Sequence, residues 1–153
     1  MNKIAAILDG LGPSQKSFYM IKEFNKAAAM KDISACAFYK KPSMPVIRPY
    51  FSCRNIAFLS GYHGAAIATT LDEANILLKS HNNSKKYLYL WDLEWLVNPV
   101  NFSAACNILL DNRLNIIARS ESHASVINNF CNKEIIGIVD NWNMDQLLDI
   151  INK

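Results

Sequence analysis

The residues best suited to chemistry in this 153-residue chain stand at the ends of short apolar runs. The run 114–118 ends in Arg119-Ser120-Glu121, and an amphipathic run over 124–131 follows. Arg119 offers a planar guanidinium that can hold a phosphate or carboxylate, and Ser120 or Ser122 can cap the following helix. Open α/β sheets bind ligands at such strand-to-helix turns. Arg119, Ser120 and Glu121 are therefore candidate ligand-binding residues, and the alternative is an Arg–Glu surface pair beside a capping serine.

The turn after the first apolar run comes closest to a known phosphate-binding motif. Residues 10–17 match G-x-x-x-x-G-K-[ST], except that Gln15 stands at the second glycine and Pro13 removes one N–H. Both changes obstruct the approach of a phosphate to the backbone, which argues against an active nucleotide triphosphatase. Two interpretations remain open: a glycine turn whose N–H groups face a sugar or phosphate, and a tight turn with an exposed lysine. The candidate ligand-binding residues of this turn are Gly10, Gly12, Ser14 and Lys16.

A histidine lies between two glycines in the segment 61–64, which follows a strand predicted over 55–59. The flanking glycines let the backbone come close to a ligand. His63 is a candidate general base because the pKa of an imidazole lies near neutrality, and Tyr62 is a candidate ligand-binding residue. The alternative is a surface-loop histidine without a role.

Two carboxylates and two indoles occur together in the segment 91–95. On extended backbone Asp92 and Glu94 point the same way and can share a site, and indoles stack on sugars or bases. Asp92 is therefore a candidate catalytic residue and Glu94 a candidate ligand-binding residue. The alternative is that Trp91 and Trp95 pack onto the core while the acids face water.

The elements that position these residues alternate between short apolar strands and amphipathic helices. Strands are predicted at 3–8, 33–39, 55–59, 65–69, 87–91, 114–118 and 134–139, and helices at 14–30, 70–80, 102–110, 124–131 and 143–151. Thr70 with Glu73, and Asn143 with Gln146, have the spacing of capping boxes at the start of two of these helices. Such alternation predicts an α/β fold: a Rossmann-like, mostly parallel sheet with helices on both faces. We expect a single domain over residues 1–153, because no linker divides the chain.

Composition excludes several classes of protein. The net charge of +3 is too small to indicate nucleic-acid binding by itself, and no apolar run approaches the ~20 residues of a membrane span. The four cysteines lack the close spacing of metal or redox motifs. We therefore expect free thiols in the cytoplasm, and no metal or cofactor.

The order of these segments resembles the N-terminal, acceptor-side domain of GT-B glycosyltransferases, in particular the glycogen-synthase-like group. The resemblance rests on the glycine-bearing loop 9–16, the strand and serine turn 116–121, and the segment 136–141 that would lead to a second domain. It implies that Gly10 and Gly12 border a cleft, that His63 is an acceptor-side base, and that Arg119 and Ser120 line the crevice. The donor-binding second domain has no counterpart here.

Three functions follow from these observations. The first is the acceptor-binding half of a split transferase, whose nucleotide-sugar site belongs to a partner chain or a homo-oligomer. The second is a non-catalytic binding or structural module derived from that fold, for example in a virus. The third is an unrelated Rossmann-like protein that binds a nucleotide through the loop 10–16. The carboxyl ends of parallel strands share one edge, so we expect Gly10, His63, Asp92 and Arg119 to converge there.

Overall fold

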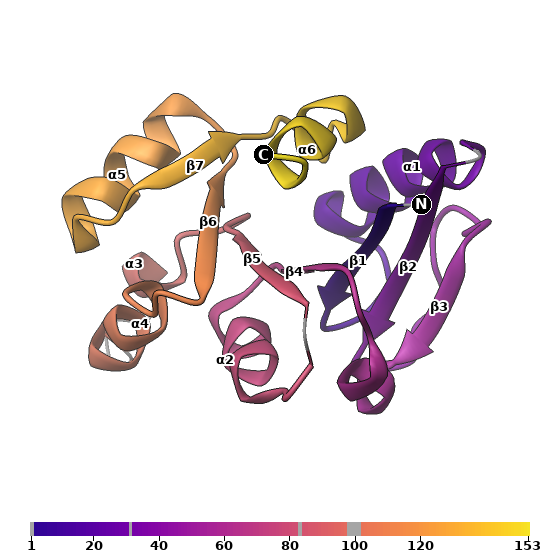
Figure 1. Ribbon diagram of the computed structural model, residues 1–153, viewed down its shortest axis with the longest axis horizontal. Coiled ribbons are helices and arrows are strands. Elements are labelled where there is room, and N and C mark those ends of the chain that lie inside the picture. Colours follow the sequence, from indigo (N-terminus) through magenta and orange to yellow (C-terminus); the bar gives the residue numbers. More distant parts are fainter. Residues whose placement is uncertain (1, 31, 83, 98–101) are drawn as a thin grey trace.

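A computed structural model describes residues 2–30, 32–82, 84–97 and 102–153 as an α/β fold built on one seven-stranded sheet (Figure 1). The strands lie in the order β3-β2-β1-β4-β5-β6-β7, and every neighbouring pair is parallel. Their bounds are β1 Asn2–Leu8, β2 Ile33–Tyr39, β3 Ser52–Asn55, β4 Ala65–Ala68, β5 Lys85–Tyr89, β6 Leu114–Ala118 and β7 Ile135–Ile138. The predicted Rossmann-like parallel sheet is thus confirmed.

Helices cover both faces of the sheet, as the alternating pattern predicts. Helices α1 (Gln15–Ala28) and α6 (Met144–Ile151) lie side by side on one face (Figure 1). The other face carries α2 (Leu71–Lys79), α4 (Phe102–Leu109), α5 (Glu121–Cys131) and the 3₁₀ segment η1 (Ile56–Gly61). The single turn α3 (Glu94–Val97) follows β5. Strands β1, β4, β5 and β6 are almost entirely buried because both of their faces are covered.

The strand order locates the place where a sheet of this kind binds its ligands. The chain moves outward from β1 to β3, returns, and then runs from β4 to β7 in the opposite direction. The loops that follow β1 and β4 therefore diverge to opposite faces, which leaves room for a ligand beyond the carboxyl ends of the strands.

Capping residues set where the helices begin. Ser14 and Ser120 cap α1 and α5, and Thr70 forms a reciprocal capping box with Glu73 at α2. The capping box predicted at 143–146 forms only in part. Asn143 accepts hydrogen bonds from the first turn of α6, but the Gln146 side chain accepts from the Asp140 N–H instead.

One strand prediction is wrong. Residues 56–61 form a 3₁₀ segment, and the strand lies just before them, at Ser52–Asn55. The Asn55 side chain accepts a hydrogen bond from the Ala57 N–H, which ends the strand and starts the 3₁₀ segment. Phe58 is largely exposed, so the apolar run is not a buried strand. Strand β5 begins two residues earlier than predicted because its pairing with β4 begins at Lys85.

The four cysteines are free, as predicted. Burial raises the pKa of the Cys36 thiol to about 11, and burial also raises the pKa of Cys53. These thiols are therefore poor nucleophiles near neutral pH. Across 2–30, 32–82, 84–97 and 102–153, every helix is too short or too polar to cross a membrane.

Candidate functional site

The structure brings three of the four predicted convergent residues to one edge of the sheet and places the fourth at the other. Gly10 follows β1, Asp92 follows β5 and Arg119 follows β6, so these three lie at the carboxyl edge. His63 directly precedes β4 and therefore lies at the amino edge with Tyr62. The predicted convergence is wrong for His63, because the expected strand at 55–59 does not form and the loop leads into a strand rather than out of one.

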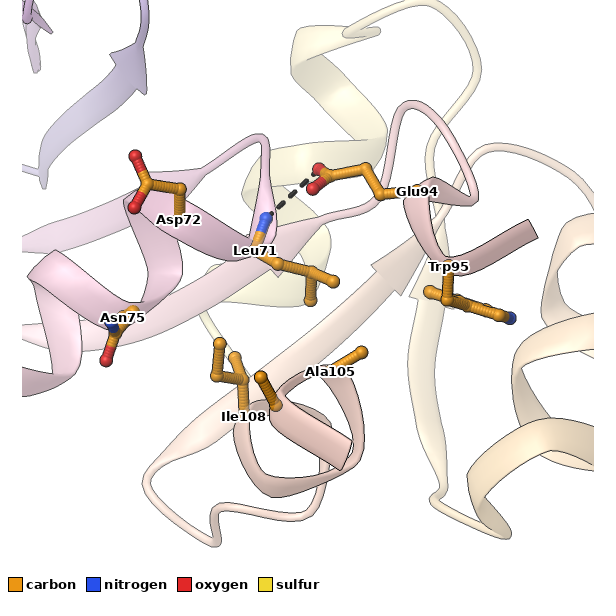
Figure 2. A pocket seen from close by; sticks show the side chains of 8 residues that line it. Leu71, Asp72, Asn75, Glu94, Trp95, Ala105 and Ile108 are labelled. Carbon is orange, nitrogen blue, oxygen red and sulfur yellow. Dashed lines mark hydrogen bonds between the residues drawn. The ribbon is translucent and has the colours of Figure 1, made fainter. Parts of the chain in front are cut away.

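The carboxyl edge carries a cavity of about 300 Å³ between α2, α3 and α4 (Figure 2). Its apolar side consists of Leu71, Trp95, Ala105 and Ile108. Its polar side consists of Asp72, Asn75 and Glu94. Figure 2 shows these side chains coming from three separate helices around a common space. An apolar lining with a few polar groups is typical of small-molecule sites.

Glu94 is the charged residue most closely built into this cavity. It is the first residue of α3, and its Oε1 accepts a hydrogen bond of 3.0 Å from the Leu71 N–H at the start of α2. Burial raises the pKa of Glu94; the Asp92 charge also raises it, whereas the Lys16 charge lowers it. The predicted ligand residues Lys16, Asp92 and Glu94 therefore lie close enough to interact electrostatically.

The expected parallel orientation of Asp92 and Glu94 does not apply. That expectation requires extended backbone, but Glu94 begins a helical turn, whose side chains spread at about 100° per residue. Asp92 is exposed, and within the described part of the chain its side chain forms no hydrogen bond or ion pair. The two acids interact through space rather than as one paired carboxylate site.

Glu73 holds the start of α2 in place, and from the sequence it is expected only as a capping residue. It is fully buried, and its Oε2 accepts hydrogen bonds from the Thr69 and Thr70 N–H groups at 3.0 Å each. The Thr69 hydroxyl lies 2.7 Å from the same oxygen. These contacts fix the start of α2 to the end of β4, and thereby hold one wall of the cavity in place.

Asp72 and Asn75 are lining residues that sequence reasoning missed. Asp72 forms an ion pair with Lys40. Burial lowers the pKa of Lys40, but its hydrogen bond to Asp72 and the nearby acidic charges outweigh that effect and raise it. Asn75 forms no side-chain hydrogen bond within the described residues, so its amide is available to a ligand. Their position in the sequence could have indicated them, because the first turns of a helix that follows a strand lie at the carboxyl edge of the sheet.

The loop after β1 is held by its own hydrogen bonds and, with Lys41 and Ser43, lines a concavity of about 480 Å³. Ser14 accepts from the Ser17 N–H, and the buried Ser17 hydroxyl donates to the Gly10 carbonyl at 3.2 Å. A Cβ at Gly10 would lie 2.8 Å from the Ser43 Oγ, and one at Gly12 would lie 3.3 Å from the Ser43 Cβ. The absence of side chains at Gly10 and Gly12 therefore allows the neighbouring 40–51 loop to pack against this turn. The four predicted ligand-binding residues of this loop thus line one concavity, and its binding of a phosphate or nucleotide stays a prediction.

Arg119 lies on an indole rather than beside a carboxylate. Its guanidinium carbon is 3.8 Å from the centre of the Trp91 ring, and one N–H donates to the Trp91 carbonyl at 3.2 Å. Among the described residues it forms no ion pair with Glu121, which is exposed. Ser120 caps α5 by accepting from the His123 N–H. Of the predicted patch, only Arg119 keeps several donors free.

The two indoles proposed as stacking platforms are instead parts of the core. Trp91 and Trp95 are only 5% and 4% exposed. Trp95 stacks on Phe130 with ring centres 4.5 Å apart, and its ring nitrogen points away from the cavity (Figure 2). The alternative interpretation holds in part: both tryptophans pack inward and Asp92 is exposed, but Glu94 is half-buried and Trp95 also lines the cavity.

No group of three or more possible metal ligands occurs within residues 2–30, 32–82, 84–97 and 102–153. Comparison of the chain with protein-family models, with curated proteins and with solved structures found no match.

Proposed function

We propose that this domain binds a hydroxyl-rich small molecule, a sugar, in the cavity between α2, α3 and α4. The observation that carries the proposal is the composition of that cavity, whose lining combines the polar residues Asp72, Asn75 and Glu94 with apolar side chains. Carboxylate oxygens accept hydrogen bonds from hydroxyl groups, and an amide both donates and accepts. The apolar lining suits the C–H face of a sugar ring.

The size of the cavity supports a small ligand. About 300 Å³ is at the lower end of the range found for small-molecule sites, which suits one sugar unit rather than a long chain. One Glu94 oxygen is already used to cap α2, which leaves the other for a ligand. The site therefore offers a few fixed acceptors rather than a strongly charged surface.

We place this sugar site in the acceptor-side half of a glycosyltransferase-like enzyme. Transfer of a sugar needs donor and acceptor held at reacting distance, so activity would require a donor site on a partner chain or a second copy. Glu94 is the residue suited to accept a proton from an acceptor hydroxyl, because burial raises the pKa of its carboxyl group.

A second candidate is a binding module without catalysis. The specific observation in its favour is that the predicted base, His63, lies at the edge of the sheet opposite the cavity. In addition, the Glu94 carboxylate already holds the start of α2. Both candidates share the sugar site and differ only in whether a donor half completes it.

Thermal denaturation with a ligand panel tests the shared proposal. We expect glucose, N-acetylglucosamine or maltose to raise the Tm in a saturable way, and UDP-glucose, ADP-glucose and ATP to have no effect beyond that of the sugar alone. Stabilisation by ATP without any sugar would instead support the nucleotide-binding interpretation of the loop 10–16.

A pair of variants on α4 makes this experiment specific. Ala104 is exposed and lines the cavity, so Ala104→Trp should fill the cavity and abolish the sugar-dependent shift in Tm. Ser103 is its exposed neighbour outside the cavity, so Ser103→Trp should leave that shift intact. Equal sugar binding by the two variants would contradict the proposed site.

A further inference from the structure

The amino edge of the sheet carries a second concavity, far from the sugar site in the topology. It has a volume of about 480 Å³ and is lined in part by Lys3, His63 and Lys85. Strands β1, β4 and β5 are neighbours, and the register pairs Ile4 with Ala65 and Ala65 with Lys85. Three strands therefore begin side by side at this edge. Side chains alternate along a strand, so Lys3, in phase with Ala5, and Lys85, in phase with Tyr87, leave opposite faces of the sheet and flank the concavity from its two sides.

The charges around this concavity are of one sign. None of the described residues that line it is acidic. Within the described part of the chain, Lys3 and His63 form no ion pair and no side-chain hydrogen bond. By contrast, Lys40 and Lys41 at the carboxyl edge pair with Asp9. Within the described residues, Lys3 and His63 thus lack the acidic partners that Lys40 and Lys41 have.

Lys85 offsets the partial negative charge of a helix end, which would otherwise repel an anion. Its Nζ donates to the Ile151 carbonyl at 3.2 Å, at the carboxyl end of α6. That end of a helix carries partial negative charge, which a lysine neutralises. At the rim, the Asn2 amide donates to the Asn152 side-chain oxygen, which leaves the Asn152 amide N–H groups free to donate.

Gly64 lets the start of β4 lie close to β1 at this concavity. Its φ of +156° is one that side-chain-bearing residues rarely adopt, and a Cβ there would lie 2.6 Å from the Lys3 carbonyl oxygen. The backbone segments therefore approach closely, with no side chain between them.

We propose that this amino-edge concavity binds a small oxyanion, namely a phosphate group, between Lys3, His63 and Lys85. Lysine ammonium and protonated imidazole groups donate charge-assisted hydrogen bonds to phosphate oxygens, and the Asn152 amide adds a neutral donor. The site is separate from the sugar cavity, so either proposal can fail without the other.

Titration of the full chain with inorganic phosphate, followed by backbone amide chemical shifts, tests this inference. We expect saturable shifts at Gly64 and Ala65, which sodium chloride at equal ionic strength does not reproduce. Shifts that chloride reproduces, or that are absent from this segment, would overturn the proposal.

Charge-removing variants supply the second arm of the test. Lys3→Gln and His63→Gln should each raise the Kd for inorganic phosphate about tenfold, because each removes a basic hydrogen-bond donor. Lys22→Gln removes an equivalent charge from an exposed position on α1 and should leave the Kd unchanged. All three side chains are exposed, so folding should survive. Equal Kd values for Lys3→Gln, His63→Gln and Lys22→Gln would overturn the assignment.

Discussion

Glu94 is a partly buried carboxyl group that lines the proposed sugar site and has a raised pKa. Because burial raises its pKa in the folded protein, the folded state holds this proton to a higher pH than the unfolded chain does. Stability therefore falls as the pH rises from the ordinary glutamate pKa through the raised one. Glu94→Gln removes this loss while the Gln oxygen can still accept from the Leu71 N–H.

We expect the free energy of unfolding of Glu94→Gln, relative to the native protein, to increase between about pH 4 and about pH 7. The gain should not exceed about 1 kcal/mol, because the carboxyl group is only partly buried and water screens it. Urea unfolding at both pH values measures the difference. A difference that does not change with pH would contradict a raised pKa at this position.

Glu73 is a buried side chain whose hydrogen-bond partners, Thr69 and Thr70, precede it closely in the sequence. Glu73→Ala leaves the Thr69 and Thr70 N–H groups without their acceptor, while the Thr69 hydroxyl can still donate to the Ile7 carbonyl. We expect a loss of about 3 kcal/mol or more in urea unfolding, since each unsatisfied buried group costs about 1–3 kcal/mol. Glu121→Ala removes an exposed glutamate from the first turn of α5 and should cost no more than about 0.5 kcal/mol. Equal losses in the two variants would contradict the anchoring role of Glu73.

At the scale of elements, the docking of α6 onto β7 depends on a missing side chain. A Cβ at Gly137 would lie 2.7 Å from the Ile150 Cγ1 and would also meet the Ile150 Cδ1. Gly137→Ala should therefore destabilise the protein by about 1–3 kcal/mol, as overpacking does. Gly61→Ala is the matched control because nothing lies within 4 Å of its added Cβ.

A double-mutant cycle isolates this contact. Ile150→Ala removes the clashing atoms, so Gly137→Ala should cost less in that background, with a coupling of at least about 0.5 kcal/mol. Chemical denaturation of the four proteins gives the coupling. Additive losses would mean that Gly137 does not contact α6 in the folded state.

Elements with a clear period and a capping residue could be predicted from the sequence. The strands at Ile33–Tyr39 and Leu114–Ala118 and the capping box at Thr70 occur as expected. The run 55–59 was misassigned because a single asparagine side chain competes with strand pairing there. Apolarity alone does not reveal such a local hydrogen bond.

At the scale of the whole molecule, the strand order decides which predicted residues can act together. The sequence predicts a parallel sheet, but the edge at which a loop lies depends on whether a strand comes before or after that loop. Because the strand expected at 55–59 does not form, His63 lies at the amino edge instead of the carboxyl edge. Asp92 and Glu94 lie at the carboxyl edge as expected, because they follow a strand that does form. The cavity itself was not predictable, because Asn75, Trp95 and Ile108 come from three separate helices whose packing only the fold specifies.

The two edges of the sheet differ in the chemistry of their side chains. The carboxyl edge combines carboxylates with an apolar cavity, and the amino edge presents unpaired basic side chains. On this account, neutral sugars and phosphate bind at opposite edges. Saturating phosphate should therefore change the Kd for a sugar little, since the sites share no residue. Competition between the two ligands would mean that one site serves both.

The most direct test of the sugar site is a titration of the isotope-labelled protein with the sugar that raises the Tm most. We expect saturable shifts of the Leu71 backbone amide, which donates to Glu94, and of the Asn75 side-chain amide, with neither shift in Ala104→Trp. Shifts confined to other parts of the chain, or unchanged shifts in Ala104→Trp, would contradict a sugar site between α2, α3 and α4.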